Sequence, residues 1–380
     1  MKLTPIIALA LVSALPLTGC MAQDDGNSNI DQTLLEQYRS ALPSQEQLSA
    51  PKVAATTAAA NGQPALYPTA SWPIVAGING SVGMLITLLK TIVALPPTVY
   101  NSATREFVWG PWPADDGVGY VAAYIKDTAG AGDFQYEYAL VRGASNDLAT
   151  LTPIIWGGAT PDPSGADRGV GVTLWDFEAD RAFHEAYDPN FDPSQGDRGR
   201  FATVWGKGED QNAPGNELAF VVAVFRDFVP ADDPTAAPND LDYFYGRYTS
   251  AAHVVDFLDF ETGIDVDEPK DGIREDVGIR MAFLDQGTGR AEADVVGGSM
   301  SANQSGSAVE CWDTSLDETY LQYQVMDSGT PSQTYTEGTY GNCGMFQATL
   351  DDLNIPSLQD IDPNLLASLD QVATTGVPAN

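Results

Sequence analysis

Alternating apolar and polar positions dominate the chain from residue 103 onward and predict a protein built mainly of β-strands. In residues 134–142 (FQYEYALVR), Phe134, Tyr136, Tyr138 and Leu140 fall on one face, and the residues between them fall on the other. Such alternation is typical of an antiparallel sheet with one face in water. The runs, separated by Gly, Pro, Asp and Asn, are residues 105–109, 119–126, 134–142, 153–156, 170–177, 201–205, 217–228, 242–249, 253–260, 278–284, 291–296, 319–326 and 343–350.

An apolar segment precedes the strands: residues 82–95 (VGMLITLLKTIVAL) would be apolar on nearly every face of a helix. Ser71 and Pro73 are typical of a helix start, and the prolines from Pro96 end the run. A membrane span is one interpretation, but Lys90 and several Gly and polar residues leave well under ~20 uninterrupted apolar positions. The predicted fold is therefore mainly β: a large antiparallel curved sheet or barrel packed on one long apolar helix, after a lipidated flexible tether.

Residues 1–20 (MKLTPIIALALVSALPLTGC) are typical of an export signal, with a charge at Lys2 before a short apolar run. The final string, LTGC, resembles the lipobox of bacterial lipoproteins. The resemblance implies that residues 1–19 are removed, that Cys20 is acylated, and that its acyl chains hold the protein to a membrane of the cell envelope. Met21 after the cysteine implies the outer membrane. A plain secretory signal beside a chance cysteine is the alternative.

The rest of the chain divides by composition into three segments. Residues 20–70 are polar and then rich in Ala, Thr and Pro, which is typical of a flexible tether, with one short helix expected at residues 30–42. Residues 71–350 hold the apolar helix and the strands. Residues 351–380 are expected to form a polar tail with a helical stretch at residues 363–372.

The charge and the cysteine content limit which binding partners and which cellular compartment are expected for the protein. The chain has 52 acidic and 18 basic residues and a formal net charge of −34. Nucleic acid is excluded as a partner, because phosphates need clustered Lys and Arg, and no polybasic stretch fits anionic lipid. With two histidines and three cysteines, His-rich or thiolate metal centres are not expected. Because exported proteins meet an oxidising environment, Cys311 and Cys343 are predicted to form a structural disulfide and not a redox pair.

One acidic loop places oxygen atoms at alternate positions and is a candidate metal site. Its candidate ligands are Asp188, Asn190, Asp192 and Asp197. The spacing resembles the start of a calcium-binding loop, but Pro193 replaces the expected Gly and Gly199 replaces the expected Glu. A crowded acidic segment at residues 265–276 is a second candidate, since a divalent cation would relieve its repulsion. Ordinary solvated loops are the alternative for both, and calcium is the only cofactor suggested.

Five tryptophans are candidates for lining a ligand site: Trp109, Trp112, Trp156, Trp175 and Trp205. A curved sheet with aromatic rings on its concave face can hold an acyl chain or a sugar ring. The alternative is that the rings fill the space between the sheet and the apolar helix.

No motif predicts a catalytic residue. The sequence lacks the strings typical of serine hydrolases, zinc proteases and phosphate-binding loops. His184 and His253 are each candidates for a general base, although neither lies in a recognisable motif. The 52 acidic residues supply so many carboxylate pairs that spacing identifies none of them.

Three short strings resemble a group of uncharacterised proteobacterial lipoproteins: ALPPT at residues 94–98, WGPW at residues 109–112 and ECWD at residues 310–313. The layout, one apolar helix followed by antiparallel strands, is similar to the LolA/LolB lipoprotein carriers, which implies a half-barrel that shelters acyl chains. We expect a non-enzymatic envelope lipoprotein whose partner is a hydrophobic small molecule between helix and sheet, or an envelope protein. The alternatives are an exported hydrolase with a carboxylate pair and a calcium-stabilised surface adhesion module.

Overall fold

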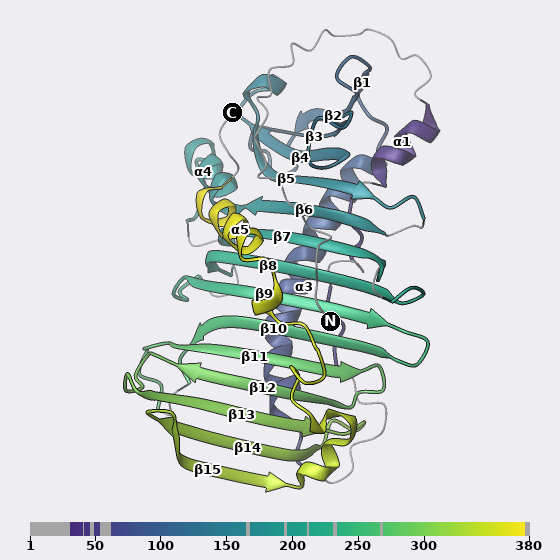
Figure 1. The fold of residues 1–380 in the computed structure, drawn as a ribbon. Helices are drawn as coiled ribbons and strands as arrows, with labels where there is room; N and C mark the ends of the chain where they lie inside the picture. Colours follow the sequence, from purple (N-terminus) through teal and green to yellow (C-terminus); the bar gives the residue numbers. More distant parts are fainter. Residues whose placement is uncertain are drawn as a thin grey trace.

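In the described part of the chain, fifteen antiparallel strands form one sheet, in which each strand is hydrogen-bonded to its neighbours in the chain (Figure 1). The computed structural model describes residues 31–40, 42–45, 49–53, 62–164, 168–193, 196–210, 213–230, 234–266 and 269–376. The prediction of a mainly β fold with a large antiparallel sheet on one long helix is confirmed. Within these residues β1 and β15 are the sheet edges, so the sheet is open and not a barrel. The predicted signal peptide and Cys20 lie outside the described residues.

The strands follow chain order: β1 (Val99–Asn101), β2 (Glu106–Pro113), β3 (Tyr120–Asp127), β4 (Tyr136–Gly143), β5 (Thr152–Pro161), β6 (Gly169–Asp176), β7 (Arg198–Glu209), β8 (Glu217–Val229), β9 (Asn239–Thr249), β10 (Val254–Ile264), β11 (Glu275–Leu284), β12 (Gly289–Val296), β13 (Gln304–Trp312), β14 (Glu318–Asp327) and β15 (Thr330–Gly338). The helices are α1 (Gln32–Arg39), α3 (Leu66–Ala94), α4 (Phe177–Tyr187) and α5 (Pro363–Thr375), with 3-10 helices η1 (Leu148–Thr150), η2 (Tyr340–Gln347) and η3 (Leu358–Asp360). The predicted strand at residues 343–350 is wrong, because most of it belongs to η2 or follows it.

The alternation misses several elements for identifiable reasons. Strands β13 (QSGSAVECW) and β15 (TPSQTYTEG) are rich in Ser, Thr and Gln, and β1 has only three residues, so none shows a clear apolar period. Pairing with neighbouring strands, and not local pattern, defines them. Helix α4 is missed because the apolar run of β6 leads directly into it. Asp176 ends that strand and caps the helix, since its carboxylate accepts a hydrogen bond from Ala179 N.

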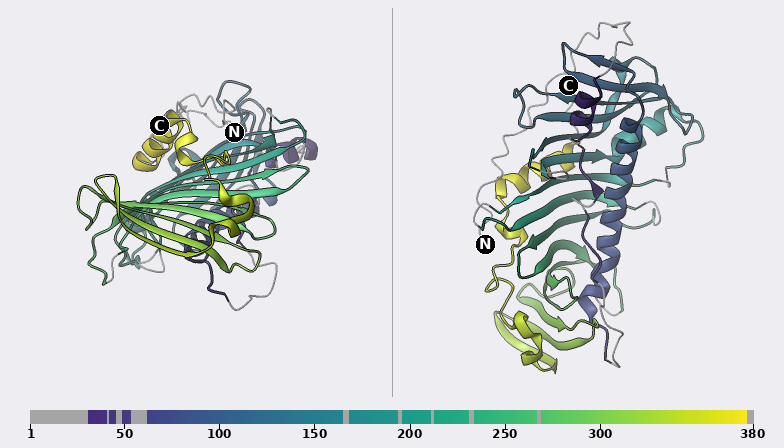
Figure 2. Two further views of the ribbon diagram at one scale, coloured as in Figure 1. Left: turned by 60° about the horizontal axis from the view of Figure 1, so that its bottom comes forward. Right: turned by 90° about the vertical axis from the view of Figure 1, so that its right-hand side faces the viewer.

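Helix α3 crosses the strands and covers one face of the sheet (Figures 1 and 2). Its buried stripe has a helical spacing of three and four residues, and each member is at most 4% exposed: Val75, Ile78, Val82, Ile86, Leu89 and Val93. Burial of six aliphatic side chains stabilises this packing by on the order of 10 kcal/mol. The predicted start at Ser71 is wrong, because the helix begins at Leu66. No helix in the described part of the chain combines the length and apolar character needed to cross a bilayer.

The C-terminal segment covers the opposite face of the central strands (Figure 1). Its buried apolar residues, each at most 8% exposed, are Leu358, Ile361, Leu365, Leu369 and Ala373. The expected wet face is therefore wrong for the strands beneath this segment, and the expected polar tail is partly an apolar cover. The one-sided set predicted in residues 134–142 is also split. Phe134 precedes β4 and packs on this second face, whereas Tyr136, Tyr138 and Leu140 lie in the layer under α3.

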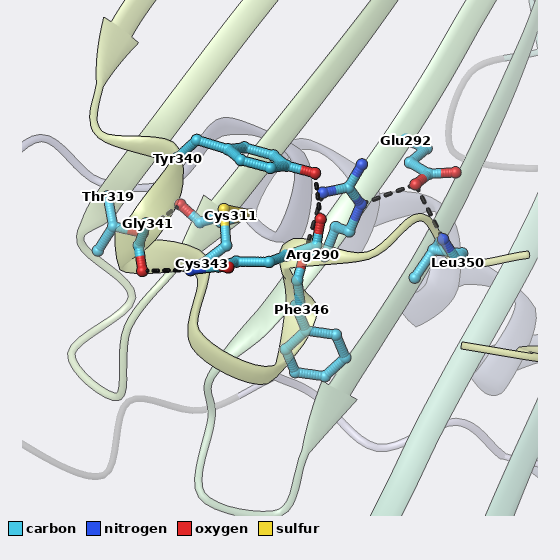
Figure 3. The surroundings of a disulfide bond; sticks show 10 residues. Arg290, Glu292, Cys311, Thr319, Tyr340, Gly341, Cys343, Phe346 and Leu350 are labelled. Carbon is cyan, nitrogen blue, oxygen red and sulfur yellow. Dashed lines mark hydrogen bonds and ion pairs between the residues drawn. A yellow bond between two sulfur atoms is a disulfide. The ribbon is translucent and has the colours of Figure 1, made fainter. Parts of the chain in front are cut away.

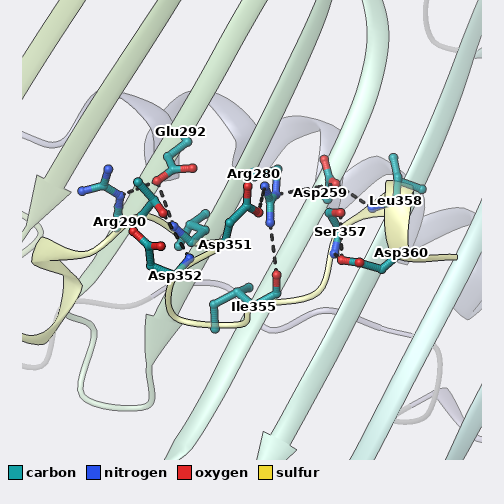
Figure 4. A network of polar contacts seen from close by, with 12 residues as sticks. Asp259, Arg280, Arg290, Glu292, Asp351, Asp352, Ile355, Ser357, Leu358 and Asp360 are labelled. Carbon is teal, nitrogen blue, oxygen red and sulfur yellow. Dashed lines mark hydrogen bonds and ion pairs between the residues drawn. The ribbon is translucent and has the colours of Figure 1, made fainter. Parts of the chain in front are cut away.

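Charged side chains of β10, β11 and β12 hold the C-terminal segment against the sheet (Figure 4). Asp259 accepts a hydrogen bond from Leu358 N at 2.7 Å, and Glu292 accepts one from the backbone N of residue 350 at 3.0 Å. Between them, Arg280 forms an ion pair of 2.8 Å with Asp351. Burial raises the pKa of Asp259 to about 7, against the opposing effects of the Leu358 bond and the charge of Arg280. These contacts fix the position of the cover on the sheet.

Part of the segment expected to be a loose tether is packed on the body. Leu35 and Tyr38 of α1 are buried, and the Tyr38 hydroxyl donates to the carbonyl of Arg105 at 2.9 Å. Further along, Asn79 of α3 exchanges two hydrogen bonds with the backbone of Ala50, at 2.7 and 3.0 Å. The composition of this segment is typical of a linker, so the sequence does not predict the few residues that make these contacts.

Candidate functional site

Four of the five tryptophans predicted to line a ligand site lie in the layer between α3 and the sheet. Trp109, Trp175 and Trp205 are at most 8% exposed, and Trp112 is partly buried against the same core. Trp156 lies on the opposite face, because its neighbour in β5 faces α3 and side chains alternate along a strand. The four rings contribute to the core beneath the helix, and their contact with a ligand stays a prediction.

A row of buried hydroxyl groups crosses the same layer. Tyr138, Thr173, Thr203 and Tyr243 occupy one line of cross-strand positions from β4 to β9, with a glycine and an alanine on the intervening strands. All four side chains are at most 1% exposed. We call these four residues the hydroxyl row. Side chains paired across an antiparallel ladder lie within reach of each other, so the row is a polar line through an apolar layer.

The two ends of the hydroxyl row differ in their hydrogen bonding. At one end, the Tyr138 hydroxyl lies 2.7 Å from Thr173 Oγ1 and also donates to the carbonyl of Val172 at 3.2 Å. At the other end, the Tyr243 hydroxyl has no hydrogen-bond partner among the described residues. Burial raises the pKa of Tyr243 far above its ordinary value, so this hydroxyl stays protonated and able to donate.

Two more unpartnered polar atoms belong to the layer under α3. They are Trp205 Nε1 on β7 and Ser71 Oγ on the helix, each from a residue at most 2% exposed. Ser71 precedes Val75 by four residues and continues the buried stripe of α3. A buried donor without a partner costs about 1–3 kcal/mol, and folded proteins satisfy nearly all of them. Like the Tyr243 hydroxyl, each of these atoms is a position where an acceptor group would be stabilised.

Helix α3 has no capping side chain of its own, and both of its ends are held by distant charged residues. At the N-terminal end, the carboxylate of Glu310 accepts from Leu66 N at 2.6 Å and from Tyr67 N at 2.8 Å. At the C-terminal end, Arg39 donates to the carbonyls of Val93, at 2.8 Å, and of the next two residues, at 3.2 Å each. The charge of Arg39 opposes the helix dipole at the C-terminal end, and Glu310 supplies the acceptor for the free backbone N–H groups at the N-terminal end.

Glu310 is itself fully buried on β13. Burial raises its pKa to about 7, although the two backbone hydrogen bonds act in the opposite direction. The residue lies in the ECWD string of the sequence, but only its hydrogen bonds to the start of α3 show what its side chain does.

A second polar cluster lies where α4 meets β4 and the turn after β2. Both ring nitrogens of His184 face carboxylates, with Nε2 at 3.5 Å from Asp116 and Nδ1 at 3.9 Å from Asp188. Arg142, which is almost fully buried, forms ion pairs with Asp116 and Asp180. Burial opposes the ionisation of Asp116, yet the hydrogen bond from Arg142 and its charge keep the pKa of Asp116 below its ordinary value. The described contacts of His184 are with carboxylates and phenyl rings, so this cluster fixes α4 to the sheet.

The predicted calcium loop follows directly on this cluster. Asp188 Oδ1 accepts a hydrogen bond from Asn190 N at 2.8 Å, so one carboxylate oxygen closes its own turn. Asp192 and Asp197 lie on either side of residues 194–195, which are outside the described residues. Among the residues that the structure describes, no group of three or more His, Cys, Asp or Glu side chains is placed to hold a metal ion. Calcium at this loop stays a prediction.

The second acidic segment has a buried carboxylate at Glu275. Its oxygens accept hydrogen bonds from Val266 N at 2.9 Å, from Ser299 N at 3.0 Å and from Ser299 Oγ at 2.9 Å. These bonds lower the pKa of Glu275 to about 2. The carboxylate therefore ties two loops of the sheet together. The other candidate base, His253, is exposed in the turn before β10.

Cys311 of β13 and Cys343 of η2 form the predicted disulfide, which is confirmed (Figure 3). Both residues are buried, and the bridge closes a sequence separation of 32 residues. Close to it, Arg290 donates to the carbonyl of Phe346 at 3.1 Å, and its guanidinium lies 5.9 Å from the ring of Tyr340. The bridge thus fixes the start of the C-terminal cover to the sheet and has a structural role.

Chemically, the layer under α3 offers two hydroxyls and an indole N–H as neutral donors within apolar surroundings. These groups can donate hydrogen bonds to an acceptor on a bound molecule. Comparison with known proteins found no matching family model, no matching curated protein and no matching solved structure. The resemblance to proteobacterial lipoproteins and to lipoprotein carriers therefore stays a prediction.

Proposed function

We propose that the protein is a non-enzymatic lipoprotein of the bacterial cell envelope that binds an amphiphilic small molecule between α3 and the sheet. The support for membrane attachment, at the outer membrane, is the LTGC string that ends at Cys20. The observation that carries the ligand is the set of three buried, unpartnered polar atoms, from Ser71, Trp205 and Tyr243. An apolar chain matches the surrounding core, and an accepting head group would satisfy one of these donors, such as the Tyr243 hydroxyl.

Entry of the ligand requires α3 to shift on the sheet. The helix is held at its ends by the hydrogen bonds of Glu310 and Arg39, while its middle packs on the sheet through apolar contacts. A hydrophobic chain can replace such contacts without exposing the core to water. Pro73 and three glycines lower the intrinsic stability of the helix, and around Gly77 and Gly80 the outward space is open. A local rearrangement of α3 is therefore less costly than one of the sheet.

The geometry supports binding better than hydrolysis. The two carboxylates whose pKa is raised to about 7 are Asp259 and Glu310. Asp259 holds the C-terminal cover and Glu310 holds α3, so these two acids lie on opposite faces of the sheet. They cannot act together on one substrate.

The proposal is tested by titrating a dansyl-labelled fatty acid into the full chain carrying Cys20→Ser, which removes the site of acylation. Tyr243→Phe and Trp205→Phe remove a polar atom but keep an aromatic ring. Each should weaken probe binding several-fold, and Tyr243→Phe should also raise the stability of the free protein by about 1 kcal/mol. The matched control is Tyr138→Phe, whose hydroxyl already has partners, and which should lower stability with little effect on binding. Absence of probe binding, or equal binding by all variants, would contradict the proposal.

A further inference from the structure

Strand β15 forms one edge of the sheet, and all nine of its residues are exposed. In the described part of the chain β15 pairs only with β14. The opposite edge differs, because β1 has three residues and its Tyr100 packs against Tyr38 and Phe107. Proteins commonly protect a long edge with lysines, proline or a bulge. In β15 such protection comes only from Pro331 and a register shift near it, both at the N-terminal end of the strand.

The register shows which backbone groups of β15 point outward. Thr339 N donates to the carbonyl of Thr319 just beyond the strand. Because hydrogen-bonded and non-hydrogen-bonded pairs alternate in an antiparallel ladder, the backbone groups of residues 337, 335 and 333 face β14. The backbone N–H and C=O groups of Thr334, Thr336 and Gly338 therefore face the open edge, where an added strand can bond to them.

The same end of the sheet carries negative charge without compensation. Residues 301–350 contain six Asp or Glu residues and no Lys, Arg or His. None of the ion pairs of the described residues includes any of these six carboxylates. Burial raises the pKa of Glu318, and the neighbouring charge of Glu337 raises it further. A cation placed beside these two carboxylates would relieve their repulsion.

We propose that β15 is a docking edge for an extended, positively charged segment of another protein, which adds to the sheet as a further strand. Outward backbone groups from Thr334 to Gly338 give the hydrogen bonds, and Glu318 and Glu337 attract Lys or Arg of the incoming strand. Tyr335, which is 53% exposed and stacked on Tyr323 at 6.4 Å, offers a ring to an apolar side chain of the partner. A second copy of this chain fits less well, because two acidic edges repel and each chain carries a net charge of −34.

The test uses a fluorescently labelled peptide, Lys-Thr-Val-Thr-Val-Thr-Lys, and a comparison peptide with Glu in place of both Lys. Each is titrated into the full chain carrying Cys20→Ser, and binding is followed by fluorescence anisotropy. Thr334→Pro removes one outward N–H but none of the bonds to β14, and proline is tolerated at such edge positions. It should weaken binding of the Lys peptide at least about tenfold, whereas the matched control Thr334→Val, which keeps the N–H, should bind as the wild type.

Charge is tested separately. Glu337→Gln should weaken binding of the Lys peptide about two- to fivefold and reduce the dependence of this binding on salt. The control Glu185→Gln, an exposed residue on α4, should change neither. Hydrogen exchange of the wild type gives a second readout that does not depend on a variant folding. The Lys peptide should protect the amides of Thr334, Thr336 and Gly338. Equal binding of both peptides, equal binding by Thr334→Pro, no protection of these amides, or a dimer joined through β15 in light scattering would overturn the proposal.

Discussion

Replacement of Glu310 by Gln should change how the stability of the fold depends on pH. Glu310 is fully buried, and its carboxylate accepts hydrogen bonds from Leu66 N and Tyr67 N at the start of α3. Burial raises its pKa from the ordinary value of 4.5 to about 7. Between these two values the unfolded chain loses the proton while the folded chain keeps it. Rising pH therefore costs stability through this window, and below it the contribution is fully present.

The size of the effect follows from the two pKa values. The interval from 4.5 to about 7, at ~1.4 kcal/mol per pH unit, gives a loss of about 3 kcal/mol in the wild type. Gln does not titrate, so the variant lacks this loss. The free energy of unfolding of Glu310→Gln, relative to the wild type, should rise by about 3 kcal/mol between pH 4 and pH 8.

The assay is urea unfolding at pH 4, 6 and 8, followed by tryptophan fluorescence, with the full chain carrying Cys20→Ser as the reference. Glu185→Gln, an exposed carboxylate on α4, is the matched control and should show no such change. A difference between Glu310→Gln and the reference that stays constant from pH 4 to pH 8 would refute the reasoning. Glu310 would then not be a buried carboxylate that holds α3.

Three further variants test other contacts of the fold. In the double variant Cys311→Ala/Cys343→Ala the free energy of unfolding should fall by about 3–4 kcal/mol, because the loop is no longer closed. An unchanged midpoint of urea unfolding would contradict this. Arg39→Ala should lower the free energy of unfolding by about 1–3 kcal/mol, because three carbonyls at the end of α3 lose their donor. Arg39→Lys should restore only part of this stability, and an unchanged Tm in Arg39→Ala would contradict the capping role of Arg39. Hydrogen bonds hold the pKa of Glu275 at about 2, so its contribution is present above its ordinary value of 4.5 and is lost as pH falls towards 2. Glu275→Gln should therefore flatten the acid transition followed by circular dichroism, and identical transitions would disprove its role.

The β-architecture could be predicted because strand alternation is a local property of the sequence. Whether the second face of the sheet is wet is not local, since it depends on a cover whose Leu358 bonds to Asp259, 99 residues earlier. The start of α3 is a sharper case. Ser71 and Pro73 look like a helix start, but the acceptor that allows the helix to begin at Leu66 is 244 residues away in Glu310.

The candidate site could be predicted only in part, for the same reason. Large aromatic residues can be recognised individually in a sequence, so the tryptophans are predictable as a group, and four of the five lie in one layer. The hydroxyl row becomes a feature only through strand register, because Thr173, Thr203 and Tyr243 belong to three strands and are far apart in the sequence. An inward-facing Thr or Tyr within an apolar run is the one signal that the sequence contains for such a row.

Native mass spectrometry tests ligand binding under α3 most directly. The full chain carrying Cys20→Ser is produced by export and measured under native and then under denaturing conditions. The proposal predicts extra mass of the size of a lipid in the native spectrum, its loss on denaturation, and a smaller bound fraction in Tyr243→Phe. Extra mass of about 40 Da per site would instead indicate calcium at the acidic loops. A native mass equal to that of the bare chain, in the wild type and the variant alike, would contradict the proposed function.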